Sequence, residues 1–137
     1  MILIIDTSKF EKIQLALFLN RKLYQTKAHV VFNESEKILP LIGQLLNRTK
    51  TKVNNLKAIF VVTGPGPFTS LRVGITIANT LGWIFKIPAI GIKNTPDMNI
   101  KRLIRSGMNK FNRTKGFKAV LPFYGKAPNI TRSKKPW

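Results

Sequence analysis

The residues most suggestive of chemistry form a glycine- and proline-rich turn that follows a continuous apolar run: Gly64, Pro65, Gly66, Pro67, Phe68 and Thr69. Such a turn resembles a nucleotide fingerprint, but it lacks a third glycine, the P-loop lysine and a ribose-binding acid about twenty residues later. We therefore exclude Rossmann and P-loop sites. Thr69 and Ser70 could contact an anion at the start of a helix, or could cap its amide groups. Arg72, one turn further on, could bind an acidic partner or RNA, or could simply be solvated.

Catalytic side chains find little support elsewhere in the chain. His29 is the one histidine and has no cysteine or suitably placed serine beside it, so we assign it a structural role. Glu34 and Glu36 point in different directions on a predicted helix, and the helix dipole explains both. The sequence contains no HExxH motif, paired histidines or recognisable triad, and we expect no metal site and no catalysis.

The composition predicts one strongly basic domain. The chain has 137 residues, 44% of them hydrophobic, a net charge of +19 and no cysteine. These values predict a single core without disulfides in a cytoplasmic protein. The longest apolar stretch, Leu71 to Ile92, is interrupted by Arg72, Asn79 and Lys86, so we expect no membrane span. The charge would attract RNA or an acidic protein, while codon bias in an AT-rich genome is the alternative explanation.

The first third of the chain predicts a strand, a hairpin and a helix. Ile2 to Ile5 is a short β-branched run typical of a buried strand. Alternating apolar residues from Ile13 to Leu19, a turn, and a second segment from Leu23 to Phe32 predict an antiparallel hairpin. A helix follows from about Glu34 to Arg48.

That first helix has recognisable start signals and a broad apolar surface. Asn33 and Glu36 resemble a capping box, and Pro40 should bend the opening turns without ending the helix. The apolar positions cover a wider arc than one face against a sheet requires, so part of the helix is expected to face a partner.

The middle of the chain predicts a strand from Ala58 to Thr63, the glycine-proline turn, a helix from about Thr69 to Phe85, and a last strand from Ala89 to Ile92. The second helix is apolar nearly all round and should be covered on two sides.

Beyond Asp97 the chain becomes more basic. Ile100 to Ile104 predicts a short basic helix, and a weakly structured stretch from Asn109 to Lys118 follows. The apolar run Ala119 to Tyr124 could return to the body of the protein, and Ser133 to Trp137 is predicted to be a basic tail.

Three segments together resemble the TsaB family: MILIIDTS, ESEKILPLIGQLL, and VVTGPGPFTSLRVGITIANTLGWIFKIPAIGI. The family has an opening strand ending in Asp-Thr-Ser, a HSERLLP helix start, and GPGSFTGLRIG before its second helix. VLPFYGKAPNITRSKK is similar, more loosely, to the family's terminal motif. Pro67 and Ser70 depart from that pattern, Glu34 stands where histidine is usual, and most of the second lobe has no counterpart.

The resemblance implies an α/β fold: one lobe of the actin, hexokinase and Hsp70-like (ribonuclease H-like) architecture, with a mixed sheet, a β-hairpin and two main helices. It implies a TsaB-like N-terminal lobe over residues 1–93 and a reduced basic C-terminal segment over residues 94–137. Asp6, Thr7 and Ser8 then occupy the place of the fold's first phosphate loop, where a carboxylate could position magnesium. Lys9 and Phe10 follow instead of glycine, which favours a simple turn.

The resemblance also implies a non-catalytic subunit in the modification of tRNA with threonylcarbamoyladenosine (t6A). Its partners would be a TsaD-like catalytic subunit, which would hold ATP and magnesium, a TsaE-like ATPase, tRNA bound directly or through the complex, and a second copy in a homodimer. The chain alone is expected to bind no cofactor. In the family the two main helices pack against the equivalent pair of the partner, which gives six candidate contacts: Leu39, Ile42, Leu46, Leu71, Ile75 and Ala78. The alternative is that these six are core residues.

A second hypothesis is a basic RNA-binding protein without a catalytic partner. Its candidate phosphate contacts are Lys101, Arg102, Arg105, Lys110, Arg113, Lys115, Lys118, Arg132, Lys134 and Lys135. A sugar kinase or ATPase ranks third.

Overall fold

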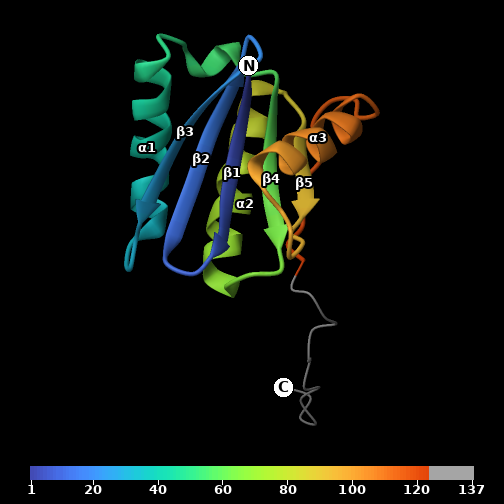
Figure 1. Cartoon of the computed structure of the whole chain (residues 1–137). Coiled ribbons are helices and arrows are strands. Elements are labelled where there is room, and N and C mark those ends of the chain that lie inside the picture. Colours follow the sequence, from blue (N-terminus) through green and yellow to red (C-terminus); the bar gives the residue numbers. More distant parts are fainter. Residues whose placement is uncertain (124–137) are drawn as a thin grey trace, which may run out of the picture.

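The first three strands form an antiparallel meander in the computed structural model, which describes residues 1–123 (Figure 1). They are β1 (Ile2–Lys9), β2 (Lys12–Leu19) and β3 (Lys22–His29). Asn20 and Arg21 both adopt positive φ angles, of 51° and 63°, as a two-residue hairpin turn between twisted strands requires. The predicted hairpin is therefore confirmed, with β2 pairing to β3 and also to β1.

Two parallel strands complete a five-stranded sheet in the order β3-β2-β1-β4-β5. β4 (Ala58–Gly64) pairs with β1, and β5 (Ala89–Lys93) pairs with β4. β4 is buried along its whole length, because it is central and covered on both faces. Its continuous apolar sequence is what a strand in that position needs.

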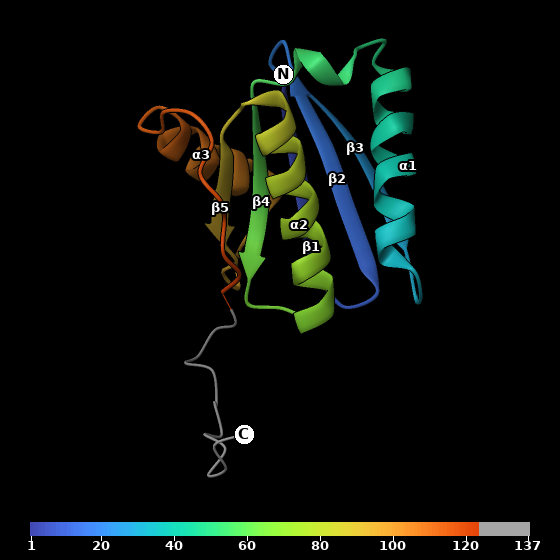
Figure 2. The same cartoon turned by 180° about the vertical axis from the view of Figure 1, so that it is seen from behind.

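Helices cover both faces of the sheet. α1 (Glu34–Arg48) and α2 (Phe68–Phe85) lie on the face shown in front in Figure 2. α3 (Ile100–Phe111) lies on the opposite face, in front of β4 and β5 in Figure 1. A short 3-10 helix, Val53–Asn55, precedes β4. The two resulting apolar layers share the sheet, which confirms the predicted α/β fold, its mixed sheet and its two main helices.

Helix α1 has the predicted bounds but not the predicted cap. Asn33 has a left-handed backbone, with φ of 62°, and its side chain makes no cap hydrogen bond. A capping side chain needs an extended backbone at that position, whereas Asn33 turns the chain from β3 into α1. The capping-box prediction is therefore wrong, and the Asn33 carbonyl instead accepts a hydrogen bond from the Glu36 amide at 3.0 Å. Pro40 lies inside α1 without ending it.

The segment after α3 returns to the body of the protein. Asn79 of α2 binds the backbone of Val120 twice, donating to its carbonyl at 3.0 Å and accepting from its amide at 2.8 Å. The Phe123 amide donates to the Thr63 carbonyl at 2.8 Å. The predicted return is thus confirmed up to Phe123. Tyr124, the rest of the predicted terminal motif, the tail, and the cations Arg132, Lys134 and Lys135 lie outside the described residues.

Candidate functional site

The glycine-proline turn packs directly on the end of β1. Gly64 has a φ of 121°, and a Cβ there would lie 2.0 Å from the Phe123 carbonyl oxygen. A Cβ on Gly66 would lie 2.5 Å from the Ser8 carbonyl oxygen. Both distances are impossible for a side-chain carbon, so the two glycines allow the turn to approach the neighbouring backbone. The Gly64–Pro65 peptide bond is cis.

Asp6, Thr7 and Ser8 use their polar groups within the protein. One carboxylate oxygen of Asp6 accepts from the Ser8 amide at 2.9 Å and from the Ser8 hydroxyl at 2.5 Å. The Thr7 hydroxyl donates to the Ser70 carbonyl at 2.7 Å. All three residues are buried, so these contacts hold the end of β1 against the start of α2.

This site does not fit the nucleotide that the fold family implies. The cavity beside Asp6 has a volume of only about 20 Å³, and the start of α3, including Met98 and Leu103, forms part of its wall. That is room for about one water molecule, whereas small-molecule sites measure several hundred Å³. Asp6, Thr7 and Ser8 lie within β1, and the chain turns only after it, at Phe10 and Glu11. The prediction of a turn at Asp6 to Ser8 is therefore wrong in its position, because the pairing of β1 with β2 continues, with one irregularity, from Asp6 to Lys9.

Ser70 and Glu34 tie the starts of the two main helices together. The Ser70 hydroxyl donates to Glu34 Oε1 at 2.7 Å. The second carboxylate oxygen, Oε2, is buried and has no hydrogen-bond partner among the described residues. The Ser70 hydroxyl thus binds a residue of α1 and does not cap α2, whose N-terminus has no side-chain cap. Thr69 is exposed, and the Arg72 guanidinium lies 5.3 Å from the centroid of the Phe68 ring.

A groove of about 370 Å³ runs between α1 and α2 on the side away from the sheet. Apolar side chains from both helices line it, with hydroxyls and one arginine among them: Ser35, Leu39, Thr69, Arg72, Val73, Thr76 and Ile77. Leu39 is 54% exposed. Since the sheet covers the other side of each helix, these residues form a surface that residues 1–123 leave open.

The structure places the six predicted partner contacts at different depths. Ile42, Leu71, Ile75 and Ala78 are at most 4% exposed and present no side chain to a partner. For these four the alternative, that they are core residues, is confirmed, because they face the sheet. Leu46 is partly buried against the same core. Leu39 alone of the six lies in the groove.

Sequence reasoning missed Val73, Thr76 and Ile77 as surface residues of the groove. All three sit between the buried positions of α2. The apolar residues of α2 surround the helix and give no strong stripe, so the sequence did not show which positions face outward. Near the end of α2, Trp83 and Ile84 are 71% and 54% exposed, so α2 is not covered on every side by the described residues.

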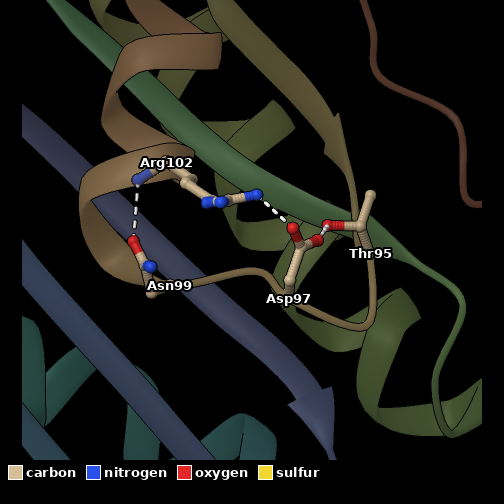
Figure 3. Close-up of polar contacts among 4 residues, drawn as sticks. All are labelled: Thr95, Asp97, Asn99 and Arg102. Carbon is tan, nitrogen blue, oxygen red and sulfur yellow. Dashed lines mark hydrogen bonds and ion pairs between the residues drawn. The ribbon is translucent and has the colours of Figure 1, made fainter.

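The predicted RNA contacts lie on or just after α3. Lys101, Arg105, Lys110 and Arg113 are exposed. Arg102 forms an ion pair with Asp97, and its amide donates to the N-cap side chain of Asn99 at 2.9 Å (Figure 3). Arg102 is therefore part of the start of α3. The Lys110 ammonium donates to the Gly91 carbonyl at 2.7 Å and the Arg113 Nε to the Asn109 carbonyl at 3.3 Å.

Asp97 is held as a carboxylate by its surroundings. A hydrogen bond from the Thr95 hydroxyl, at 2.9 Å, is the main cause that lowers the pKa of Asp97, followed by a backbone hydrogen bond and the charge of Arg102 (Figure 3). Its side chain is well exposed, so the interaction is screened by solvent.

Other chemical sites are few among residues 1–123. His29 Nε2 lies 3.3 Å from Glu11 Oε2 on the surface, in keeping with a structural role. No group of three or more histidine, aspartate or glutamate side chains gathers to hold a metal in this part of the chain. None of the helices described is long and apolar enough to cross a membrane.

Solved structures share this fold. YeaZ from Pseudomonas aeruginosa superposes with a TM-score of 0.65 at 24% sequence identity, over 68% of this chain and 43% of that one. This likeness concerns the fold alone, and it agrees with a single α/β lobe that corresponds to part of the solved protein.

Curated relatives share the sequence. The tRNA threonylcarbamoyladenosine biosynthesis protein TsaB of Buchnera aphidicola subsp. Schizaphis graminum is 34% identical over 91 residues, which is 66% of this chain and 43% of that protein. TsaB of Bacillus subtilis is 32% identical over 96 residues, 68% of this chain and 41% of that protein. The chain thus spans less than half the length of the curated relatives it matches.

A family model described as "TsaD: tRNA N6-adenosine threonylcarbamoyltransferase" matches residues 29–102. The match includes α1, the glycine-proline turn and α2, and it extends into the start of α3. Because it covers more than half of the chain, the protein belongs to the family that this model describes, and within that family it is TsaB-like.

Proposed function

We propose that this chain is a non-catalytic subunit in the biosynthesis of threonylcarbamoyladenosine in tRNA, and that it docks a TsaD-like catalytic subunit through α1 and α2. The curated relatives support the pathway, because their names place them in it. The groove between α1 and α2 supports the mode of docking, and it is the observation on which the proposal rests.

The groove has the properties of a helix-binding surface. Its apolar lining comes from Leu39, Val73 and Ile77, and its polar lining from Ser35, Thr69, Thr76 and Arg72. An amphipathic helix would bury apolar side chains against that apolar lining while its polar flanks stay in water. A pair of helices from a related protein fits this surface by packing ridges into grooves. Arg72 would meet an acidic side chain of the partner.

The non-catalytic role agrees with the geometry at the end of β1. Asp6, Thr7 and Ser8 are bonded within the protein, and the space beside Asp6 holds about 20 Å³. We therefore assign ATP and magnesium to the TsaD-like partner. A TsaE-like ATPase and tRNA would join through that complex, and a second copy of this chain could occupy the same groove in the absence of the partner.

Two substitutions with matched exposure test the docking surface. Leu39 and Ile84 are both 54% exposed, yet only Leu39 lines the groove. Leu39→Asp places a charge in the apolar lining of the groove and should weaken the complex with a purified TsaD-like protein at least about tenfold, a cost of roughly 1.4 kcal/mol for an interface residue. Ile84→Asp makes the same chemical change on α2 outside the groove and should leave the affinity unchanged.

Calorimetric titration of the TsaD-like protein with each variant supplies the measurement, and thermal melts confirm that both variants fold. Failure of the unmodified chain to form any complex at micromolar concentrations, with and without ATP, contradicts the docking proposal. If both substitutions weaken the complex equally, the interface does not lie in the groove.

A further inference from the structure

A cavity of about 630 Å³ lies beside β5, which is an edge strand of the sheet. Its wall is formed by β5, Thr63 of β4, the end of α3 with the residues just after it, and the returning segment 118–123. In Figures 1 and 2 the segment after α3 runs beside β5 in both views. The cavity is remote in sequence from the groove between α1 and α2 and shares no lining residue with it.

Four cations from three separate elements converge on this cavity. Lys93 comes from the end of β5, Lys110 and Arg113 from the end of α3 and the residues after it, and Lys118 from the returning segment. All four are exposed. Lys110 is held in place because its ammonium donates to the Gly91 carbonyl at 2.7 Å. The cations are therefore brought together by the fold and not by one charged run of sequence.

No acidic side chain neutralises this cluster. None lines the cavity, and the sequence contains no aspartate or glutamate after Asp97. Asp97 pairs with Arg102, Glu11 with His29, and Glu34 binds Ser70. Like charges brought this close repel one another unless an anion lies between them, so the cavity is suited to a polyanion.

The cavity also offers an aromatic and apolar surface beside the charge. The ammonium of Lys93 lies 4.4 Å from the centroid of the Phe123 ring, and that residue is 37% exposed. Leu121, two residues before Phe123 in the chain, is 79% exposed and adds apolar surface. Proteins that bind single-stranded nucleic acids combine a positive groove for phosphates with aromatic rings on which bases stack. An acidic peptide would use the charge but would gain little from the ring.

We propose that this cavity binds single-stranded RNA, with Lys93, Lys110, Arg113 and Lys118 contacting phosphates and Phe123 stacking on a base. The inference goes beyond the proposed function because it assigns direct RNA binding to the isolated chain. It adds Lys93 and Phe123 to the RNA contacts that the sequence predicts. The fold brings both residues next to the cations of α3.

The test measures binding of a labelled oligouridylate of about twelve nucleotides to the full chain by fluorescence anisotropy across a range of salt. The double variant Lys93→Gln with Lys118→Gln removes two phosphate contacts and leaves the Lys110 hydrogen bond intact. Each lost contact with single-stranded RNA reduces the salt slope by about 0.7, so the slope should fall by about 1.4. Affinity near 0.1 M salt should fall about tenfold or more.

The control removes the same charge at the opposite edge of the sheet. Lys22 and Lys27 are exposed on β3, roughly 19 Å from β5 across four strand spacings, which is beyond the screening length of about 10 Å at 0.1 M salt. Lys22→Gln with Lys27→Gln should leave the salt slope and the affinity unchanged. Thermal melts check that both double variants remain folded.

A third variant, Phe123→Ala, separates RNA from other polyanions. It should weaken RNA binding about fivefold or more, from the loss of one base stack, while weak binding to poly-glutamate stays the same. Three results would each overturn the proposal. They are an equal loss of RNA affinity in the two double lysine variants, binding of poly-glutamate as tight as that of RNA, and full displacement of the RNA by millimolar inorganic phosphate. The complex with a TsaD-like protein should survive all three variants, so the two proposals can fail separately.

Discussion

Gly107 offers a direct test of how α3 packs on the sheet. It is buried at the point where α3 crosses Phe60 of β4, and a Cβ at position 107 would lie 2.3 Å from one ring carbon and 2.5 Å from the next. Carbon atoms in contact prefer about 3.5 to 4.0 Å, so alanine requires a movement of about 1 Å or more. Phe60 cannot easily give way, because it is fully buried and its ring packs edge-on against Phe111.

Two opposing terms set the size of the effect. Overpacking of a well-packed core costs typically about 1 to 3 kcal/mol. Replacing glycine with alanine inside a helix contributes about 0.8 to 1 kcal/mol in the other direction. Gly107→Ala should therefore lower the free energy of unfolding by up to about 2 kcal/mol.

Gly43 of α1 supplies the matched control, because a Cβ there meets no atom within 4 Å. Gly43→Ala gains the same helix propensity without a clash and should stabilise the protein by about 0.5 to 1 kcal/mol. Urea unfolding of both variants measures the difference, and with a slope of about 1 to 3 kcal/mol per molar urea the two midpoints should lie on opposite sides of the unmodified protein. If both substitutions stabilise the chain to the same extent, α3 is not packed against Phe60 as described.

Three further substitutions test other parts of the structure. Asn99→Ala removes the side-chain cap of α3 and should cost about 1 kcal/mol of unfolding free energy in the same urea assay. Ser70→Ala leaves the Glu34 carboxylate without its hydroxyl donor and should cost about 1.5 kcal/mol, with Thr69→Ala as an exposed control of no effect. The pKa of Asp97 is lowered in the folded state, so its contribution is complete above the unfolded value of about 3.9 and is lost as the pH falls below it. Asp97→Asn should remove that part of the acid dependence, seen as a flatter change of urea midpoint with pH below about 4.

The sequence predicted the elements because their signals are local. The two-residue turn at Asn20 and Arg21, the unbroken apolar run of β4 and the bounds of α1 all depend on neighbouring residues. The resemblance to TsaB was likewise readable from contiguous motifs, and the relatives confirm it.

The sites were harder to predict because they depend on contacts across the fold. Whether Ile75 or Ile77 faces the sheet is decided by how α2 is rotated, and an all-apolar helix does not reveal that rotation. The close approach of Gly107 to Phe60 joins residues on elements far apart in sequence. Lys93 and Phe123 meet only because the chain returns along β5 after α3.

Photo-crosslinking from the groove tests the central claim most directly. A photoreactive phenylalanine analogue at Thr76, which is exposed and lines the groove, is compared with the same analogue at Lys101, which is exposed on α3 across the sheet. In a mixture with a purified TsaD-like protein, we predict a covalent adduct between the two chains from position 76 and none from position 101. An adduct from position 101 alone, or from neither position while the complex forms, would contradict docking through α1 and α2.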